Sequence, residues 1–482
     1  MSSSDPQLLV IGGVAAGAAA AGRARRLHSS ARITIVERGP YMSYANCGLP
    51  YYISRDINDR SKLLVATPEG FKERYNIDVH LNTEALAIDR KNKRVQVKHD
   101  NELSWLSYDA LILAQGGRPV RPVLPGSDAG HVFTLWTVPD MDALDHFIVS
   151  ETPRTAVIVG GGFIGLEMAE AFHARGIATT VVELQPTVMS VMDPEFGEMI
   201  AAELVSKGVN VITGVAVSEV LSSPREVLLS DGRSLSADLV LFSVGVRPEL
   251  ALARNCGLEI GASGGLVVDK WLRTSDPNIF AAGDMIELPI FVSGRPGRVP
   301  LAGPANRQGR IAAENVASLL CGESAEVLSY AGALGTSVVK VLDATAALTG
   351  LGEHAAREAG FDVGVAVVEA NDHAGYYPGA HKLKLKIVYD RQSERLLGAQ
   401  AFGAAGVDKR IDVLATALRG RLTVHDLAEL DLGYAPPYST TNDIVNTAAF
   451  VAQKDQLERR SSAATTSSSG SLRSISSVES TA

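Results

Sequence analysis

The sequence predicts an α/β protein made of two parallel βαβ units, followed by a separate C-terminal α+β domain. Residues 8–37 and 155–183 each read as a buried strand, a glycine-rich turn, a helix and a second strand. From about residue 334 the pattern becomes alternating, with a strand expected near 382–389 and a helix near 411–419. The chain has 482 residues, of which 46% are hydrophobic and 21% charged, so two or three globular domains are expected.

The composition excludes several kinds of protein. The net charge of −9 offers no basic surface, so we expect no binding to nucleic acid. No stretch reaches about 18 strongly apolar residues, so no membrane span is expected. The three cysteines, Cys47, Cys256 and Cys321, are too far apart for a CxxC pair or a metal site, so we expect a reducing, cytoplasmic location.

The second glycine-rich turn has the spacing of a dinucleotide-binding loop. Gly160 allows the tight turn, Gly162 lets the backbone approach a pyrophosphate, and Gly165 allows the helix to pack on the strand. Glu183 ends the next strand, where its carboxylate would accept hydrogen bonds from a ribose 2′-OH and repel a 2′-phosphate. We therefore expect NADH to bind here, with NADPH as the alternative. If the loop binds no nucleotide, it is a chance cluster of glycines.

The first glycine-rich turn is less regular. Gly12, Gly13 and Gly17 are present, but Val14 stands where the fingerprint has its middle glycine. Glu37 follows at the end of the next strand, where an adenosine ribose would lie. The pattern predicts a second nucleotide site, and a purely structural βαβ turn is the alternative.

Cys47 lies in residues 43–52 (SYANCGLPYY), where Gly48 and Pro50 indicate a turn into a helix. A thiol at a helix N-terminus is favoured as thiolate, the reactive form. With no cysteine nearby, its oxidised form would be a sulfenate or a mixed disulfide with a small thiol. Taken by itself, a lone cysteine is more often a small buried side chain, and this is our interpretation of Cys256 and Cys321.

With these motifs in place, the chain resembles the pyridine nucleotide-disulfide oxidoreductases from Leu8 to about Gln453. The family's second flavin motif matches residues 274–284, in which Gly283 and Asp284 would contact FAD, Asp284 through the ribityl chain. Two crossings between domains are matched by residues 114–119, although Gln115 replaces the usual Thr, and by residues 245–248, which begin at Gly245. The resemblance implies FAD as a cofactor alongside NADH.

The resemblance also implies a domain order. It gives two Rossmann-like FAD- and NAD(P)-binding domains of the glutathione-reductase type and a C-terminal α+β dimerisation domain. Residues 1–151 and 271–325 would form the FAD domain, 152–270 the NAD(P)H domain and 326–456 the dimerisation domain. Residues 457–482 are rich in Ser and Thr, and we expect a disordered tail.

Within the family, SYANCGLPYY resembles the single-cysteine branch of coenzyme A-disulfide and persulfide reductases, as do residues 371–379 and 433–439. The resemblance implies a homodimer in which Tyr376 and Tyr434 of one subunit lie beside Cys47 of the other. A phenol there can donate a proton or hydrogen bond to a leaving thiolate. For Tyr377 and Tyr438, packing at a dimer interface is as good an explanation.

The resemblance also implies a coenzyme A site. Its basic residue would be Arg26, and its polar residues Ser43 and Asn46. Two positions that can carry phosphate-binding lysines are Tyr75 and Asn442 here, which removes positive charge. The resemblance nevertheless implies a small disulfide, persulfide or polysulfide as substrate, and it favours coenzyme A disulfide or persulfide among them.

Two other functions fit the same motifs. One is an NADH oxidase that reduces oxygen through a sulfenate at Cys47, and the other is a flavin-based redox sensor without turnover. Oxidases and peroxidases of the family carry a histidine in the first glycine loop, where this chain has Ala15. That difference argues against the oxidase, and the lack of a recognisable output domain argues against the sensor.

Overall fold

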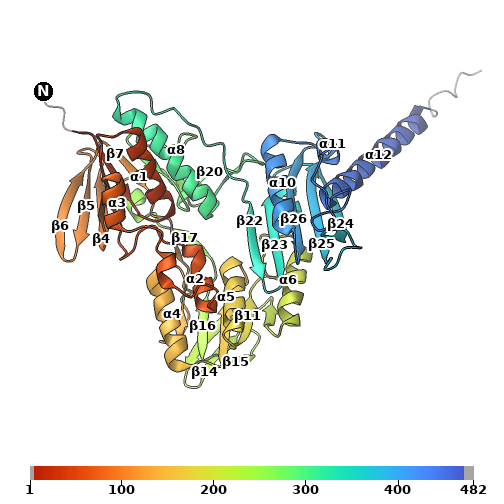
Figure 1. The fold of residues 1–482 in the computed structure, drawn as a ribbon, viewed down its shortest axis with the longest axis horizontal. Helices are drawn as coiled ribbons and strands as arrows, with labels where there is room; N and C mark the ends of the chain where they lie inside the picture. Colours follow the sequence, from red (N-terminus) through yellow and green to blue (C-terminus); the bar gives the residue numbers. More distant parts are fainter. Residues whose placement is uncertain (1–4, 472–482) are drawn as a thin grey trace, which may run out of the picture. The chain divides into compact units, whose positions relative to one another are not determined.

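The structure is a computed structural model that describes residues 5–471. It contains two compact units (Figure 1). The first unit comprises the chain up to Ser190 together with Gly197–Gly335. The second comprises Val191–Phe196 and the chain from Thr336 onward.

A five-stranded parallel sheet with the strand order β19-β7-β1-β2-β3 is the frame of the first unit. Helix α1 contains almost only alanine and glycine before its arginines, so a second helix, α8, packs closely against it. A Cβ at Gly309 of α8 would collide with the Ala16 carbonyl group, which shows how near the two backbones lie. The elements are β1 (Gln7–Ile11), α1 (Ala15–Leu27), β2 (Arg32–Val36), β3 (Asp78–His80), β7 (Ala110–Leu113), β19 (Ile279–Ala281) and α8 (Ala302–Leu320).

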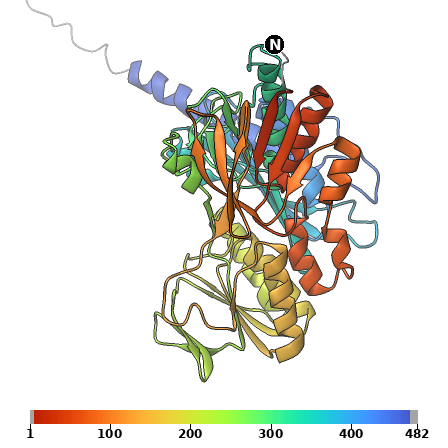
Figure 2. The ribbon, with the colours of Figure 1, turned by 90° about the vertical axis from the view of Figure 1, so that its left-hand side faces the viewer.

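Smaller elements surround this sheet. The strands β4, β5 and β6 form an antiparallel sheet, drawn in orange in Figures 1 and 2. Between β2 and β3 the chain makes two short 3₁₀ turns and two short helices, which carry Cys47 and Tyr75. The elements are η1 (Asn46–Gly48), α2 (Leu49–Ser54), η2 (Arg60–Leu63), α3 (Pro68–Tyr75), β4 (Thr83–Asp89), β5 (Arg94–His99), β6 (Glu102–Ser107), β18 (Leu266–Val267), β20 (Ile286–Pro289) and β21 (Pro296–Gly297).

A second five-stranded parallel sheet, with the order β12-β11-β10-β16-β9, repeats the βαβ design. The strands and helix predicted for residues 155–183 are confirmed. The elements of this part are α4 (Val138–Glu151), β9 (Val132–Phe133), β10 (Thr155–Val159), α5 (Phe163–Ala174), β11 (Ala178–Glu183), α6 (Pro194–Ser206), β12 (Asn210–Thr213), β13 (Val217–Ser222), β14 (Arg225–Leu229), β15 (Ser234–Ser236), β16 (Leu239–Phe242) and α7 (Ala251–Asn255). The crossing strands β8 (Gly117–Pro119) and β17 (Val246–Pro248) pair antiparallel.

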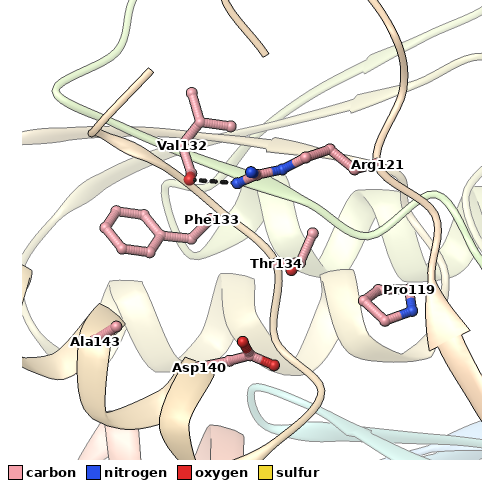
Figure 3. A pocket seen from close by; sticks show the side chains of 7 residues that line it. All are labelled: Pro119, Arg121, Val132, Phe133, Thr134, Asp140 and Ala143. Atoms are coloured by element: carbon pink, nitrogen blue, oxygen red, sulfur yellow. Dashed lines mark hydrogen bonds between the residues drawn. The ribbon is translucent and has the colours of Figure 1, made fainter. Parts of the chain in front are cut away.

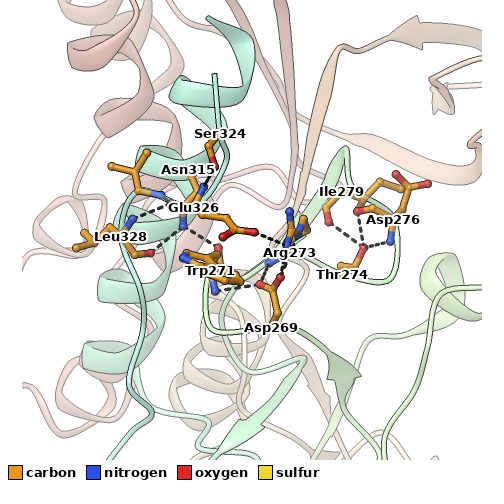
Figure 4. Close-up of polar contacts among 11 residues, drawn as sticks. Asp269, Trp271, Arg273, Thr274, Asp276, Ile279, Asn315, Ser324, Glu326 and Leu328 are labelled. Atoms are coloured by element: carbon orange, nitrogen blue, oxygen red, sulfur yellow. Dashed lines mark hydrogen bonds and ion pairs between the residues drawn. The ribbon is translucent and has the colours of Figure 1, made fainter. Parts of the chain in front are cut away.

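The buried amide of Asn315 fastens α8 to the chain on either side of it (Figure 4). Its Nδ2 donates to the carbonyl oxygens of Trp271 (2.8 Å) and Leu328 (2.9 Å), and its Oδ1 accepts from the backbone N–H groups of Val327 and Leu328. Arg273 adds an ion pair with Asp269. These bonds fix the segment that leads into β19 and thereby complete the first sheet.

The second unit is built on an antiparallel sheet with the order β22-β23-β26-β25-β24, as the alternating pattern predicted. Helix α10 packs on β23 and β26, and α12 packs on β24 and β25. The elements are β22 (Ser337–Val341), β23 (Ala344–Gly350), α9 (Glu353–Glu358), β24 (Val363–Asn371), β25 (Lys382–Asp390), β26 (Leu396–Gly403), α10 (Val407–Gly420), α11 (Val424–Ala428) and α12 (Ile444–Ser471).

Helix α12 differs from the expectation of a disordered tail from residue 457. It continues to Ser471, because a helix that is nucleated by its buried first turns gains one hydrogen bond for each residue that it adds. Residues 472–482 of the expected tail lie outside the described residues. Within residues 5–471, no helix is both long and apolar enough to cross a membrane.

Candidate active site

The two glycine-rich loops have the geometry that their spacing predicts. Gly12 and Gly160 have φ of +101° and +108°, a conformation that favours glycine. A Cβ at Gly17 would collide with the Gly12 carbonyl group, and one at Gly165 with the Gly160 carbonyl group. Each third glycine is therefore required for the contact between its helix and the preceding turn.

The two predicted ribose-binding acids make matching contacts with these loops. Glu37 accepts hydrogen bonds from the N–H groups of Gly13 and Gly39, both at 2.8 Å. Glu183 accepts from the N–H group of Gly161 at 2.6 Å and from that of Gln185 at 2.8 Å. Each carboxylate lies at the carboxyl end of its sheet, next to the loop that would hold the pyrophosphate.

The residues around both loops fit a bound dinucleotide. Helices α1 and α5 begin without a side-chain cap from any described residue, so the N–H groups of their first turns remain available for phosphates. At Gly162, the first residue before α5, an added Cβ would meet only open space. The structure thus leaves the approach to this helix terminus open.

Polar groups near the first loop also fit a cofactor. The Oε1 atom of Gln115 is buried and has no hydrogen-bond partner in the part of the chain that the structure describes. Gln115 follows β7, and its backbone nitrogen lies close to Gly12. Burial raises the pKa of the Asp284 carboxyl to about 6, although Arg298 opposes the shift. An unpaired buried amide and a desolvated carboxyl are the groups that polar atoms of a flavin nucleotide would satisfy.

A cavity of about 260 Å³ lies beside the crossing strand β8, which contributes Pro119 to its lining (Figure 3). The predicted Gly245 has φ of +101° and accepts a hydrogen bond from Val120 at the same crossing. Both charged side chains of the cavity are already engaged: Arg121 donates to the Val132 carbonyl oxygen at 2.7 Å, and Asp140 caps α4. The cavity contains none of the predicted site residues; its lining is Pro119, Arg121, Val132, Phe133, Thr134, Asp140 and Ala143.

Cys47 sits in the short turn η1, directly before α2, as Gly48 and Pro50 predicted. Its side chain is exposed, and its Sγ lies 3.7 Å from the Oδ1 atom of Asn46, which also accepts the Cys47 N–H at 3.1 Å. The turn therefore presents one thiol at the surface of the first unit with a polar neighbour beside it.

The groups around Cys47 oppose the thiolate form that the start of a helix was expected to favour. Burial of the region around the sulfur raises the pKa of the thiol, and the carboxylates of Glu167 and Asp284 raise it further. Helix α2 spans only Leu49–Ser54, too short for its dipole to outweigh these effects. Desolvation and nearby negative charge both favour the neutral thiol.

Glu167 was not singled out by the sequence. It projects from α5, two residues after Gly165, and accepts a hydrogen bond from the Tyr51 hydroxyl at 3.4 Å. Burial raises the pKa of Glu167 to about 7, and burial together with Glu167 raises the pKa of Tyr51 to about 12. A helix position can be predicted from the sequence, but the approach of α5 to α2 depends on the tertiary fold.

A second cavity, of about 230 Å³, lies between the first glycine loop and the cysteine segment. Of the predicted substrate-binding residues it includes Ser43, while Asn46 lies beside Cys47. Arg26 is exposed on α1 with its guanidinium 5.7 Å from the ring centre of Tyr75. The cavity is lined by Val14, Ala15, Ala18, Ala19, Ser43, Tyr44, Phe71 and Asn306.

The second unit brings Tyr376 and Tyr434 together, although they are far apart in the sequence. Their hydroxyl oxygens are 2.9 Å apart and share a hydrogen bond. Both side chains are exposed, by 74% and 45%, so the pair faces outward and is free to meet another surface. The shared hydrogen bond raises the pKa of Tyr376.

The remaining cysteines do not both fit the interpretation as buried packing residues. Cys256 is half-buried beside the first core, but Cys321 is exposed where α8 ends. The apolar residues before it face the core, and the helix ends one residue before Cys321. The apolar residues next to Cys321 in the sequence therefore do not indicate that its own side chain is buried.

Comparison with known proteins identifies the class. The family model described as pyridine nucleotide-disulphide oxidoreductase matches residues 6–309, and that family's dimerisation domain matches residues 336–444. The chain belongs to this family of oxidoreductases, as the motifs predicted, and is an enzyme that works with FAD and a nicotinamide nucleotide.

Individual relatives narrow the class. The chain is 35% identical to the coenzyme A disulfide reductase of Staphylococcus haemolyticus, over 93% of this chain and 99% of that protein. It is 36% identical to the CoA-dependent NAD(P)H sulfur oxidoreductase of Pyrococcus abyssi, over 90% and 96%. The crystal structure of reduced CoADR-RHD of Bacillus anthracis has a TM-score of 0.91 and 41% identity, covering 94% of this chain and 81% of that one.

Proposed function

We propose that this enzyme uses NADH, or NADPH, to reduce coenzyme A disulfide or coenzyme A persulfide through a mixed disulfide at Cys47. The observation that carries the proposal is the exposed thiol of Cys47, which lies beside Asn46 in the segment from which Ser43 lines a cavity of about 230 Å³. The names of the relatives support the sulfur substrate.

The chemistry of this chain's residues follows from that thiol. Cys47 loses its proton and attacks one sulfur of the substrate disulfide as a thiolate; the mixed disulfide forms as the S–S bond of the substrate breaks, and the first product thiolate takes up the proton and leaves as a thiol. Two electrons then break the mixed disulfide, releasing the second thiolate and restoring Cys47. When bound, FAD supplies the passage of those electrons from the nicotinamide.

The other residues have binding and proton-donating roles in this proposal. Gly12, Gly13, Gly17, Glu37, Gln115, Gly283 and Asp284 would hold FAD, and Gly160, Gly162, Gly165, Glu183 and Gly245 would hold the nicotinamide nucleotide. Arg26, Ser43 and Asn46 would bind coenzyme A. Tyr376 and Tyr434 would donate a hydrogen bond or proton to the leaving thiolate.

We also propose a homodimer in the cytoplasm. The match to a dimerisation domain over residues 336–444 and the outward-facing tyrosine pair support an assembly in which each second unit serves the partner's cysteine. Three free cysteines suit a reducing compartment.

Anaerobic NADH consumption tests the proposal. Purified FAD-loaded protein should consume NADH when offered coenzyme A disulfide or persulfide, and the Cys47→Ser variant should keep its flavin but lose this turnover. A Cys321→Ser variant is the matched control, because Cys321 is also exposed, and it should keep full activity. Turnover that requires air and ignores sulfur compounds would instead indicate an NADH oxidase.

A further inference from the structure

Tyr376 and Tyr434 lie on two loops, so other residues must fix the conformation of these loops for the two hydroxyl groups to meet. Tyr376 lies between β24 and β25, in the first tyrosine segment, residues 371–379. Tyr434 lies between α11 and α12, in the second tyrosine segment, residues 433–439. The backbones of the segments are joined by one hydrogen bond, from the Ala374 N–H to the Pro436 carbonyl oxygen at 3.2 Å.

Arg410 lies behind both segments. It belongs to the first turn of α10 and is only 2% exposed. Its Nη2 donates to the Asp372 carbonyl oxygen, in the first segment, at 2.7 Å. The same guanidinium forms a buried ion pair with Asp443, at 2.9 Å from Nη2 and 3.1 Å from Nε.

Asp443 extends the connection to the second segment. Its Oδ2 accepts a hydrogen bond from the Ser439 hydroxyl at 2.7 Å, and its Oδ1 accepts from the Val445 N–H at 3.1 Å, where α12 begins. Burial alone would raise the pKa of Asp443, but the hydrogen bonds from Arg410 and Ser439 hold it below its ordinary value. The carboxylate therefore stays charged and bound to both partners.

The site is shaped for an arginine. Gly406 has φ of +67°, and a Cβ there would collide with the Arg410 guanidinium, whose Nη1 donates to the Gly406 carbonyl oxygen at 3.1 Å. A planar fork with several donors can serve Gly406, Asp372 and Asp443 together, whereas a lysine ammonium is a single compact group.

We infer that Arg410 is a positioning residue: through Asp372 and the Asp443–Ser439 pair, it holds the two tyrosine segments so that Tyr376 and Tyr434 share their hydrogen bond. The inference deepens the proposed function, on which the catalytic use of the pair rests. The placement of the pair by Arg410 can be measured independently of any catalytic role of the pair.

The first experiment measures whether Arg410 places the two tyrosines so that they share a hydrogen bond. Tyrosinate absorbance of the FAD-loaded protein is followed against pH in the wild type, Tyr434→Phe and Arg410→Lys. Loss of the shared hydrogen bond in Tyr434→Phe should lower the pKa of Tyr376, and Arg410→Lys should reproduce that downward shift. An Arg410→Lys titration identical to the wild type would overturn the inference.

The second experiment measures whether the placement of the tyrosine pair contributes to turnover. Arg410→Lys should lower kcat for the sulfur substrate about 10-fold, because small displacements of a reacting group are costly, and should leave flavin reduction by NADH unchanged. In a Tyr376→Phe background the same substitution should lower kcat no further. An equal loss of kcat in both backgrounds would mean general damage and would contradict the inference.

Two further variants distinguish a specific effect of Arg410 from general misfolding. Ser439→Ala removes one hydrogen bond of the connection and should give a smaller change in the same direction. Arg391→Lys alters another Arg–Asp pair of the second unit, with Asp455, at the opposite end of β24, and should affect neither titration nor kcat. If Tyr376→Phe leaves kcat unchanged, the catalytic role of the pair fails, and the titration alone decides on Arg410.

Discussion

Cys47 shows that the reactivity of a thiol is set by what surrounds it. The start of a helix favours a thiolate, but burial and the two nearby carboxylates of Glu167 and Asp284 raise the pKa of this thiol. Glu167 has a pKa of about 7, so its charge changes near neutral pH. As the pH rises and Glu167 ionises, its negative charge makes ionisation of Cys47 harder.

Glu167→Gln should therefore lower the pKa of Cys47. The glutamine keeps the size of the side chain and removes the negative charge. The pH dependence of Cys47 alkylation by iodoacetamide, in FAD-loaded protein, measures the change. Glu198→Gln, an exposed glutamate on α6, should leave the curve unmoved, and an unmoved curve for Glu167→Gln would contradict the prediction.

Among the elements, the turn before α5 separates two uses of glycine. Gly165 is in contact with the Gly160 carbonyl group, whereas Gly162 faces open space. Gly165→Ala should push the helix away from the turn and lower the melting temperature, because an overpacked contact typically costs about 1–3 kcal/mol. Gly162→Ala should preserve the melting temperature but raise KM for NADH, because the methyl group obstructs the approach of the pyrophosphate.

Melting curves and NADH kinetics of the two variants check this prediction. Gly176→Ala, at a left-handed turn outside the loop, should lower the melting temperature without raising KM and serves as the control for backbone strain. Equal effects of Gly162→Ala and Gly165→Ala on KM would contradict the division of roles.

The elements of both βαβ units could be predicted because their patterns are local. A strand of apolar residues, glycines at fixed spacing and an acid at the end of the next strand all fall within about 30 residues. The approach of Glu167 to Tyr51 joins residues that are 116 positions apart in the chain, and no local pattern records it. The Arg410 connection was missed for the same reason.

For the long helix α12, the sequence predicted disorder where the structure has a helix. Its last turns are rich in Ser and Thr, which favoured a prediction of disorder. The buried residues Val445, Ala448 and Ala452 anchor its first half on the sheet of the second unit, and the helix continues from there. Composition judges a segment alone and does not include the helix that precedes it.

At the scale of the whole chain, six residues from the middle of the sequence, Val191–Phe196, belong to the C-terminal unit. Their carboxylates meet Lys386, which is 3% exposed: its Nζ lies 2.8 Å from Asp193 and 2.7 Å from Glu195. Glu353 completes the cluster at 2.9 Å. Burial opposes the charge on Lys386, but its three hydrogen bonds raise its pKa.

Lys386→Met should destabilise the second unit by about 3–5 kcal/mol at neutral pH, because it leaves the buried carboxylate of Asp193 without its cationic partner. The hydrogen bonds from Lys386 help to lower the pKa of Glu195 and Glu353, so their stabilising effect is present above the pKa of an unfolded glutamate and is lost as the pH falls. The defect should therefore shrink in acid. Urea denaturation at about pH 7 and about pH 3 measures it, with the exposed Lys382→Met as control.

A mixed dimer tests whether the active site is shared between subunits. One subunit carries Cys47→Ser and the other Tyr376→Phe with Tyr434→Phe, so that each alone is impaired. If the tyrosine pair serves the partner's cysteine, the mixed dimer has one intact site and should regain about half of the wild-type activity. Activity no higher than that of the two parent proteins would place the cysteine and the tyrosines of a site in one chain.

The position of β19 also determines the order in which a growing chain can fold. The first sheet lacks its edge strand until Ile279–Ala281 leave the ribosome, and α8 follows later still. All strands of the second sheet lie between residues 132 and 242 and are therefore complete earlier. Because domains fold as units during synthesis, the part built on the second sheet, which we propose binds the nicotinamide nucleotide, should fold first. The first half of the part that we propose binds FAD must wait for its second half before it can take up that cofactor.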